Sequence, residues 1–295
     1  MIAKDDAPVV KGLLFAGCSF TWGQGLYYYS NLPTLREPPP DCYDPAMVTA
    51  AHKKFMETVR FPRLVAQHFK TWEVVHPDNG GSNLSAIRWW RSSFNEMPSG
   101  PDQTIKEYDY SEFSHVFFQL TQWHRDNIEI EIDGQRHDVP MNIVLGGPGF
   151  EEWPERFGRW LKMQNLTWNM WVNKYIDENV ARVKAFLQEF ESHGVQPVLI
   201  LWPERNNHEA VGDEYMSRIN KDPWLRKRFM KIFYNDNVYN SMEGLMLANP
   251  EMTIKFDYKN FIEPPQDHHP SLMCHRVMAD NIIKLLIEQT TKLNS

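Results

Sequence analysis

The sequence predicts a three-layer α/β fold, in which helices cover both faces of a central, mostly parallel sheet. Five short apolar runs have the length of buried strands, and helical patterns separate most of them. Strands that are apolar on both sides are typical of a parallel sheet whose two faces are covered. The five runs are Gly12 to Gly17, Glu73 to His76, His115 to Thr121, Gln196 to Trp202 and Thr253 to Asp257. We therefore expect a central sheet of five strands.

Five further segments have the pattern of helices. One runs from Trp171 to His193, and Gly194 is well placed to end it. Another runs from Ser271 to Leu293 and carries an apolar stripe at helix spacing. The other three are Pro45 to Phe69, Asn83 to Met97 and Asp222 to Tyr234.

Two segments interrupt the alternation of strands and helices. Leu32 to Pro45 is rich in proline, which predicts an irregular loop. Ile128 to Val139 alternates around Asp133-Gly134, which predicts a β-hairpin. The hairpin and the Trp-rich region that follows resemble an insertion between the third strand and the next helix. Without an internal repeat or a linker, we expect one domain over residues 1–295, with insertions at about 26–60 and 123–170.

Composition narrows the class of protein. Among 295 residues, 42% are hydrophobic, which is enough for a sizeable core. The net charge of -7, without a run of like charges, argues against nucleic-acid binding. Three cysteines without paired spacing, Cys18, Cys42 and Cys274, predict neither a disulfide framework nor a metal site. No phosphate-binding loop is present, and no cofactor is expected.

The N-terminus has two acidic residues before a short apolar run, unlike a secretory signal peptide. No window approaches the roughly 18 apolar residues of a membrane-spanning helix. We therefore expect no membrane partner and a cytoplasmic or virion-associated location. The sequence leaves the oligomeric state open.

Residues at the carboxyl ends of parallel strands form the sites of open α/β sheets. The first strand ends in GCSFTWGQG, where Ser19 can expose its hydroxyl at a strand-to-helix turn. The alternative is that Ser19 is an ordinary helix N-cap. The second strand ends in HPDNGGSN, where the glycine pair leaves N–H groups free to meet an anion, although a plain turn has the same pattern.

The segment DHHPSLMCH precedes the last predicted helix. The Asp267 carboxylate can orient the imidazole of His269, which can then take the proton of a serine. His268 or His275 could instead bind a metal together with His269, but no further His or Cys cluster completes such a site. We expect His275 to be structural.

Together these motifs resemble the SGNH (GDSL-like) hydrolase superfamily. GCSFTWG is similar to its first block, usually Gly-Asp-Ser-x-Thr-x-Gly, which implies Ser19 as the nucleophile. NGGSN is similar to its second block, where the N–H of Gly81 would help to form the oxyanion hole. DHHP is similar to its last block, which implies that Asp267 and His269 complete the triad. The resemblance implies a flavodoxin-like fold and a covalent acyl-serine intermediate.

Two blocks depart from the family pattern. Cys18 stands where the family commonly has Asp, and we expect it to be a buried small residue. The third block is usually Gly-x-Asn-Asp at the end of the third strand, and its Asn donates to the oxyanion. Here that strand ends in FFQLTQWHR, so Thr121 or Gln122, or Asn83 from the neighbouring loop, would supply the donor.

Several residues after the strands are candidates for substrate contact. They are Trp22, Trp123, His124, Arg125, Glu204 and Arg205. Arg125 could bind a substrate carboxylate, and a surface salt bridge is the alternative. The 11 Trp residues either pack the core or form an aromatic wall around a ligand pocket, since sugars and acyl chains both bind flat rings.

The sequence therefore predicts a serine ester hydrolase that acts on small acyl esters, with O-acetyl carbohydrate esters as one possibility. One alternative keeps the fold without turnover, as a binding or structural protein of a phage or cell-surface assembly. Another is acyl transfer, which uses the same triad and differs in what excludes water.

Overall fold

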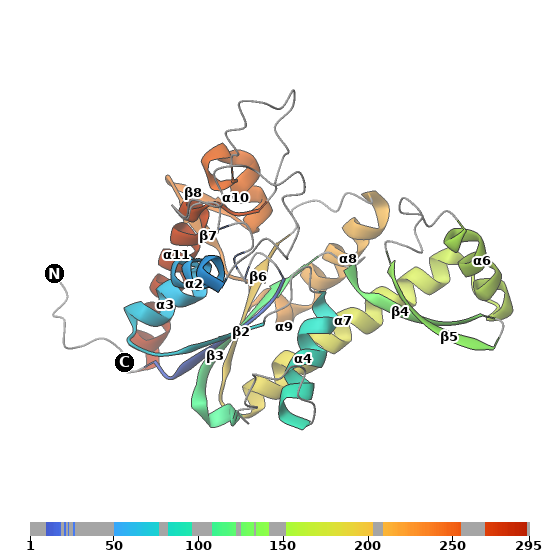
Figure 1. Cartoon of the computed structure of the whole chain (residues 1–295), viewed down its shortest axis with the longest axis horizontal. Helices are drawn as coiled ribbons and strands as arrows, with labels where there is room; N and C mark the ends of the chain where they lie inside the picture. The colour runs from blue at the N-terminus through green and yellow to red at the C-terminus, as the bar shows by residue number, and fades with distance from the viewer. Residues whose placement is uncertain are drawn as a thin grey trace.

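The computed structural model describes residues 10–18, 21, 23, 26, 50–76, 82–95, 108–121, 125–132, 134–141, 152–202, 209–254 and 269–293. Its centre is a sheet of four parallel strands in the order β2-β1-β3-β6 (Figure 1). The strands are β1 (Gly12–Ala16), β2 (Glu73–Val75), β3 (Phe113–Leu120) and β6 (Gln196–Leu201). The prediction of a central parallel sheet in an α/β fold is confirmed.

The fifth predicted strand, Thr253 to Asp257, is not part of this sheet in the described residues. Thr253 forms an antiparallel bridge with Pro270, and residues 255–257 lie outside the described part of the chain. The segment beside the outer edge of β6 is instead Arg228 to Met230. Leu199 N donates to Arg228 O at 2.8 Å, and Met230 N donates to Leu199 O at 2.8 Å. This contact is a single parallel bridge, too short for apolar periodicity to reveal it.

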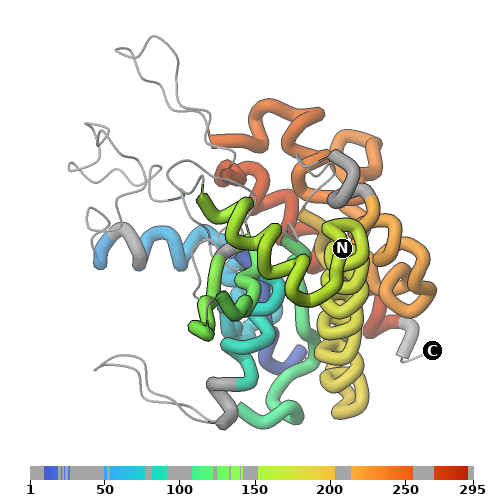
Figure 2. Tube along the Cα trace, turned by 90° about the vertical axis from the view of Figure 1, so that its right-hand side faces the viewer, coloured from blue at the N-terminus to red at the C-terminus, as the bar shows by residue number. Residues whose placement is uncertain are grey.

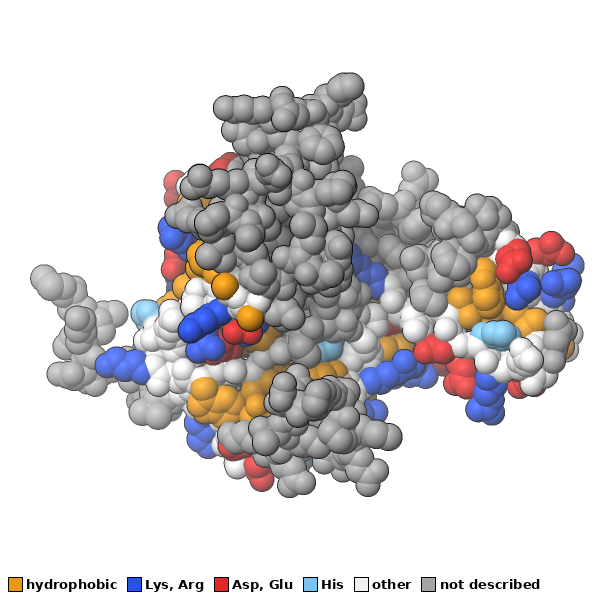
Figure 3. All heavy atoms as spheres, in the orientation of Figure 1, with side chains coloured by type: hydrophobic (Ala, Val, Ile, Leu, Met, Phe, Trp, Pro, Cys, Tyr) orange, Lys and Arg blue, Asp and Glu red, His pale blue; other side chains and the backbone are white. Residues whose placement is uncertain are grey.

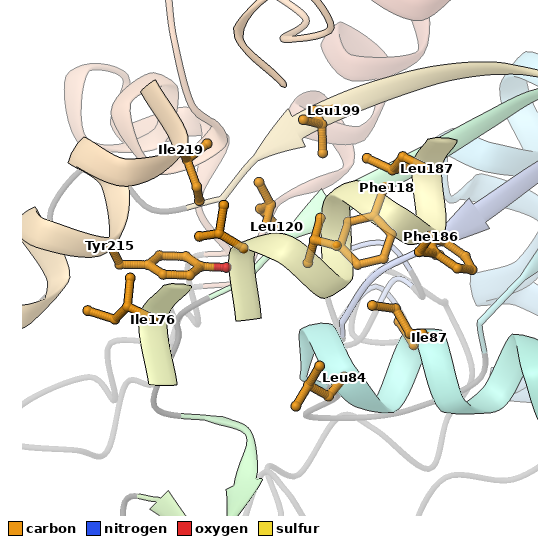
Figure 4. Packing of buried hydrophobic residues seen from close by; sticks show 14 of the residues in the cluster. Leu84, Ile87, Phe118, Leu120, Ile176, Phe186, Leu187, Leu199, Tyr215 and Ile219 are labelled. Carbon is orange, nitrogen blue, oxygen red and sulfur yellow. The ribbon is translucent and has the colours of Figure 1, made fainter. Parts of the chain in front are cut away.

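Helices cover both faces of the sheet, as predicted. Successive strand residues point to opposite faces, so Leu14 and Phe118 pack into one buried cluster, and Leu13 and Phe117 pack into another. The first cluster includes residues of α4 (Asn83–Asn95), α7 (Trp168–Ser192) and α8 (Glu209–Lys221), and Figure 4 shows its centre. The second includes residues of α3 (Phe61–His68), α10 (Met242–Ala248) and α11 (Leu272–Leu293).

The helical pattern from Pro45 to Phe69 divides into two helices. They are α2 (Ala50–Val59) and α3, and Arg60 between them has an extended backbone. Pro62 causes the break, because a proline lacks the N–H of a helix interior and also keeps the preceding residues from continuing a helix. The patterns at α4, α7 and α11 are confirmed with small changes in their ends.

The helix predicted from Asp222 to Tyr234 is wrong. Only α9 (Pro223–Arg226) is helical there, and it is followed by a hairpin of β7 (Ile232–Tyr234) and β8 (Asn237–Tyr239). Asn235 and Asp236 both have positive φ, at 47° and 59°, which suits the two-residue turn of a twisted hairpin. Two short 3₁₀ helices, Tyr110–Glu112 and Pro250–Met252, complete the described elements.

The predicted hairpin after the third strand is confirmed as β4 (Asn127–Ile132) and β5 (Gln135–Pro140), with Gly134 at a φ of 75°. It is followed by α6 (Trp153–Met163), which packs against the N-terminal part of α7 (Figures 1 and 2). Hydrophobic side chains of this region reach the surface and are bordered by charged ones (Figure 3). The Trp-rich segment thus forms an outer layer that packs against the first half of α7.

Candidate active site

The residues predicted to act in catalysis or binding are described in part. Asn83, Thr121, Arg125 and His269 are described. The predictions for Ser19, Trp22, Gly81, Gln122, Trp123, His124, Glu204, Arg205, Asp267 and His268 concern positions outside the described residues. The described part of the candidate site consists of the residues that flank these positions.

The end of β1 is held by the side chain of Gln119 in β3. The Thr21 hydroxyl donates to Gln119 Oε1, and the Cys18 thiol lies 3.6 Å from the same oxygen. Gln119 Nε2 in turn donates to the sulfur of Met242 at 3.4 Å. Thr21 N also donates to Cys18 O at 3.0 Å. One buried amide therefore fixes the residues on both sides of position 19.

Gly17 lies where this turn leaves no room for a side chain. A Cβ at this position would lie 2.4 Å from the Thr21 hydroxyl oxygen and 2.9 Å from Gln119 Cβ. Cys18, the next residue, is completely buried, as the sequence predicted. Glycine at position 17 is therefore required by the close approach of Thr21 and Gln119.

His76 follows β2 and lies against the same turn. Its Nδ1 is 2.7 Å from the carbonyl oxygen of Gly17, and its ring packs against Trp89 with centroids 5.0 Å apart. Because a carbonyl only accepts, Nδ1 carries the proton in this contact. Sequence reasoning missed both His76 and Gln119 as site residues. The sequence feature that could have revealed them is a polar residue within an apolar strand, as for Gln119, or directly after one, as for His76.

Thr121 directly follows β3 and is paired with Asn83 at the start of α4. Thr121 N donates to Asn83 Oδ1 at 2.9 Å, and Asn83 Nδ2 donates to Thr121 O at 3.2 Å. The same Nδ2 donates to the hydroxyl of Tyr215 at 3.0 Å. Both protons of the Asn83 amide are thus used within the core. The Thr121 hydroxyl is buried and has no hydrogen-bond partner among the described residues.

Arg125 and Asp126 lie where the chain passes from β3 into the β4–β5 hairpin. Arg125 is half-buried, and Asp126 is completely buried. The Asp126 carboxylate accepts from Leu84 N at 3.0 Å in the first turn of α4. Burial raises the pKa of Asp126, and hydrogen bonds from neighbours such as Leu84 N oppose that rise.

His269 is half-buried and directly precedes α11. Its carbonyl oxygen accepts from Ile254 N at 3.0 Å, and Ser271 N donates to Met252 O at 2.7 Å. Ser271 also accepts from Cys274 N at 3.3 Å, which begins the helix. Backbone hydrogen bonds on both sides thus fix the segment that carries this imidazole.

His275 has a structural role, as predicted. It is completely buried, and its Nδ1 accepts from Phe61 N at 3.1 Å at the start of α3. Burial, aided by the nearby charge of Arg60, lowers the pKa of His275 to about 3, so the ring is neutral. No group of three or more His, Cys, Asp or Glu side chains in the described ranges could hold a metal ion.

Two hollows open on the described surface. One, of about 240 Å³, lies at the amino end of β6, beside Gln196 and Arg228, away from the strand ends that carry the candidate residues. The other, of about 170 Å³, lies between α6 and α7. It is lined by Trp160, Gln164, Leu166, Trp171, Lys174, Tyr175 and Glu178. Within the described part of the chain, no helix is long and apolar enough to cross a membrane.

No protein-family model and no curated protein sequence matches the chain. Several solved structures match nearly all of it. The esterase EstA from Pseudoalteromonas sp. matches over 97% of this chain and 100% of its own, with 8% identity and a TM-score of 0.42. A G-D-S-L family protein from Desulfitobacterium hafniense matches over 93% and 99%, with 10% identity and a TM-score of 0.41.

A carbohydrate esterase family 2 enzyme with a carbohydrate-binding domain, from Corynascus thermopiles (Myceliophthora fergusii), also matches. It covers 95% of this chain and 67% of its own, with 13% identity and a TM-score of 0.41. All three TM-scores are below 0.5, so the fold assignment rests on the strand order and the helices that cover the sheet.

Proposed function

We propose that the chain is a serine ester hydrolase of the SGNH (GDSL-like) type that acts on small acyl esters. The observation that carries this proposal is the junction of β1 and β3 at their carboxyl ends. Gln119 fixes Cys18 and Thr21 around position 19, and Thr121 follows only two residues later. The resemblance assigns the nucleophile and the third block to these two adjacent strand ends.

In the proposed reaction, His269 takes the proton of the Ser19 hydroxyl while Ser19 Oγ attacks the acyl carbonyl. Asp267 orients the imidazole and stabilises its protonated form. The alcohol leaves with the proton held by His269, which leaves the acyl group on Ser19. Water, deprotonated by His269, then attacks this ester and releases the carboxylic acid and the free serine.

The oxyanion of each tetrahedral intermediate would be held by the backbone N–H groups of Ser19 and Gly81. Thr121 is our candidate for the third donor, because its hydroxyl has no hydrogen-bond partner among the described residues. The Asn83 amide is already engaged by Thr121 O and Tyr215. Gln122 is the remaining candidate for this position.

The direct test uses the wild-type protein. We expect it to hydrolyse p-nitrophenyl acetate and to be labelled by a serine-directed fluorophosphonate. A folded protein that shows neither would contradict the hydrolase proposal. Light scattering after size-exclusion chromatography, together with a glycan-binding assay, would then examine the alternative of a binding or structural protein.

Replacement of Thr121 by valine keeps the shape of the side chain and removes its hydroxyl. We expect kcat for p-nitrophenyl acetate to fall by about 100-fold, as for the loss of one oxyanion donor. KM should change little, because the donor acts mainly on the developing charge. If kcat is unchanged, Thr121 is not the donor, and the same measurement on Gln122→Ala examines the other candidate.

We further propose that the ester belongs to a carbohydrate. The cleft between α6 and α7 combines the rings of Trp160, Trp171 and Tyr175 with polar groups at its rim. Sugar rings bind flat aromatic faces through their C–H groups and polar rims through their hydroxyls. Lys174 and Glu178, whose charged groups lie 3.8 Å apart, would supply such a rim.

This extension predicts a substrate-dependent effect of Trp160→Ala. We expect KM for an O-acetylated xylo-oligosaccharide to rise by roughly fivefold, which corresponds to the loss of one aromatic contact. KM for p-nitrophenyl acetate should stay the same. The matched control is Trp153→Ala on the same helix, whose ring packs against His137 and Arg156 outside the cleft. Equal effects of both variants would argue against a sugar subsite in the cleft.

A further inference from the structure

A continuous chain of buried hydrogen bonds joins the base of the insertion to the end of β3. Asn179 Nδ2 donates to Asp126 Oδ2 at 2.5 Å. The Tyr215 hydroxyl donates to Asn179 Oδ1 at 3.0 Å and accepts from Asn83 Nδ2 at 3.0 Å. Asn83 then binds both the N–H and the carbonyl of Thr121. Four different segments, widely separated in sequence, thus meet in one network.

The backbone of Thr121 sets the direction of the bonds at one end of this network, because its N–H only donates and its carbonyl only accepts. At the other end, Asn179 turns its Nδ2 toward Asp126 Oδ2, which accepts. Asn179 Oδ1 is then left to accept from the Tyr215 hydroxyl, whose oxygen accepts from Asn83 Nδ2. This leaves Asn83 Oδ1 as the acceptor for the N–H of Thr121.

The Asp126 carboxyl has a further hydrogen-bond partner. Its other oxygen accepts from Leu84 N at 3.0 Å in the first turn of α4, where the helix dipole favours a negative charge. Burial, followed by the charge of Asp126, raises the pKa of the nearby Tyr175 hydroxyl, which therefore stays neutral. Asp126 thus accepts from both α4 and α7.

The position of the network within the core makes a purely structural role a poor explanation. Tyr215 is completely buried, and Figure 4 shows its ring among Ile176, Leu120 and Ile219. An apolar group of the same shape would fill this space, and buried polar networks are often no more stabilising than well-packed apolar residues. What the network adds is a fixed orientation for each of its amides.

We propose that Asp126, acting through Asn179 and Tyr215, holds the Asn83 amide in place and thereby positions Thr121 at the carboxyl end of β3 for catalysis. These four are positioning residues, since none of them is assigned a contact with the reacting atoms. The insertion is then part of the active-site machinery, because Asp126 lies at its base. This inference rests on the proposed hydrolase function and extends it.

The test is Tyr215→Phe, which removes the hydroxyl that joins Asn83 to Asn179. We expect kcat for p-nitrophenyl acetate to fall by at least about tenfold with KM unchanged, since small displacements of a catalytic group lower the rate steeply. Thr121→Val should lower kcat much less in the Tyr215→Phe background than in the wild type. The matched control is Tyr110→Phe, whose hydroxyl binds Glu189 at 2.5 Å and which should keep the wild-type kcat.

Amide hydrogen exchange measures the same positioning without any activity. In Tyr215→Phe, we expect the N–H of Thr121 to exchange at least about tenfold faster, while the N–H of Phe117 in the same strand is unchanged. If the Tyr215 variant does not fold, Asp126→Asn takes its place, because an amide has a single oxygen and cannot accept from Leu84 N and Asn179 Nδ2 with two oxygens as Asp126 does. The same increase in Thr121 exchange is expected there.

The outcomes separate this inference from the proposed function. A wild type without esterase activity would refute the hydrolase proposal, and exchange at Thr121 would still decide whether the network holds that residue. An active wild type whose Tyr215→Phe and Asp126→Asn variants keep kcat and Thr121 exchange would overturn the positioning role alone. Additive effects of Thr121→Val and Tyr215→Phe would also overturn it.

Discussion

Replacement of Ser19 by alanine is expected to abolish hydrolysis of p-nitrophenyl acetate and labelling by a fluorophosphonate. The nucleophile forms the covalent intermediate, so its loss removes the reaction path rather than weakening one step of it. We expect kcat to fall by at least about 1,000-fold. Any rate enhancement that remains in the variant would come from substrate binding and the oxyanion donors. The measurement is initial rate on purified protein, with labelling followed on a gel.

The matched control is Ser192→Ala at the end of α7. Its hydroxyl binds the carbonyl oxygen of Glu189 at 2.7 Å, remote from the carboxyl ends of the strands. This variant should keep the wild-type rate and labelling. If Ser19→Ala is still labelled while its circular dichroism spectrum is that of the wild type, the nucleophile is a different residue.

Trp90→Ala is expected to have the largest effect on stability. The side chain is only 1% exposed, and its ring lies 4.8 Å from that of Phe190 and 5.6 Å from that of Phe113. Its loss opens a cavity between α4, α7 and β3, which should lower the free energy of unfolding by about 3 to 5 kcal/mol. Urea unfolding of both proteins, monitored by circular dichroism, measures this difference. The comparison requires that the m-values of the variant and the wild type are equal.

Trp89→Ala provides the comparison, because the neighbouring residue on the same helix is only half-buried. Its ring packs against His76. We expect a loss of about 1 to 2 kcal/mol, since less of its surface is removed from water. An equal loss in both variants would contradict the assignment of Trp90 to the centre of this core.

Four strands of the sheet could be predicted, because the apolar run of each one can be recognised within its own few residues. PVLILW and the run from Gly12 to Gly17 are apolar throughout, which suffices for a strand with both faces covered. The hairpin around Gly134 was equally predictable, since its turn needs the positive φ of 75° that this residue adopts. In both cases the deciding physical forces act over a few neighbouring residues.

The errors lie where tertiary contacts decide between local alternatives. Residues 222–234 contain enough apolar side chains for a helix, yet only Pro223–Arg226 is helical. Arg228 to Met230 pairs with β6, and Ile232–Tyr234 forms one strand of a hairpin. The backbone of Leu199 offers hydrogen bonds at a free sheet edge, which a local pattern does not record. Thr253, where a fifth strand was expected to begin, forms an antiparallel bridge with Pro270, and residues 255–257 lie outside the described part of the chain.

By itself, the sequence determined that strands and helices would follow one another in the order of a three-layer α/β fold, and it named Ser19 and His269 as candidate catalytic residues. Only the tertiary structure decided which side chains surround Thr121. Asn83 and Tyr215 are 132 residues apart, and Asp126 and Asn179 are 53 apart. Hydrogen bonds between such distant residues depend on how the sheet and its helices pack, because no local pattern encodes their meeting.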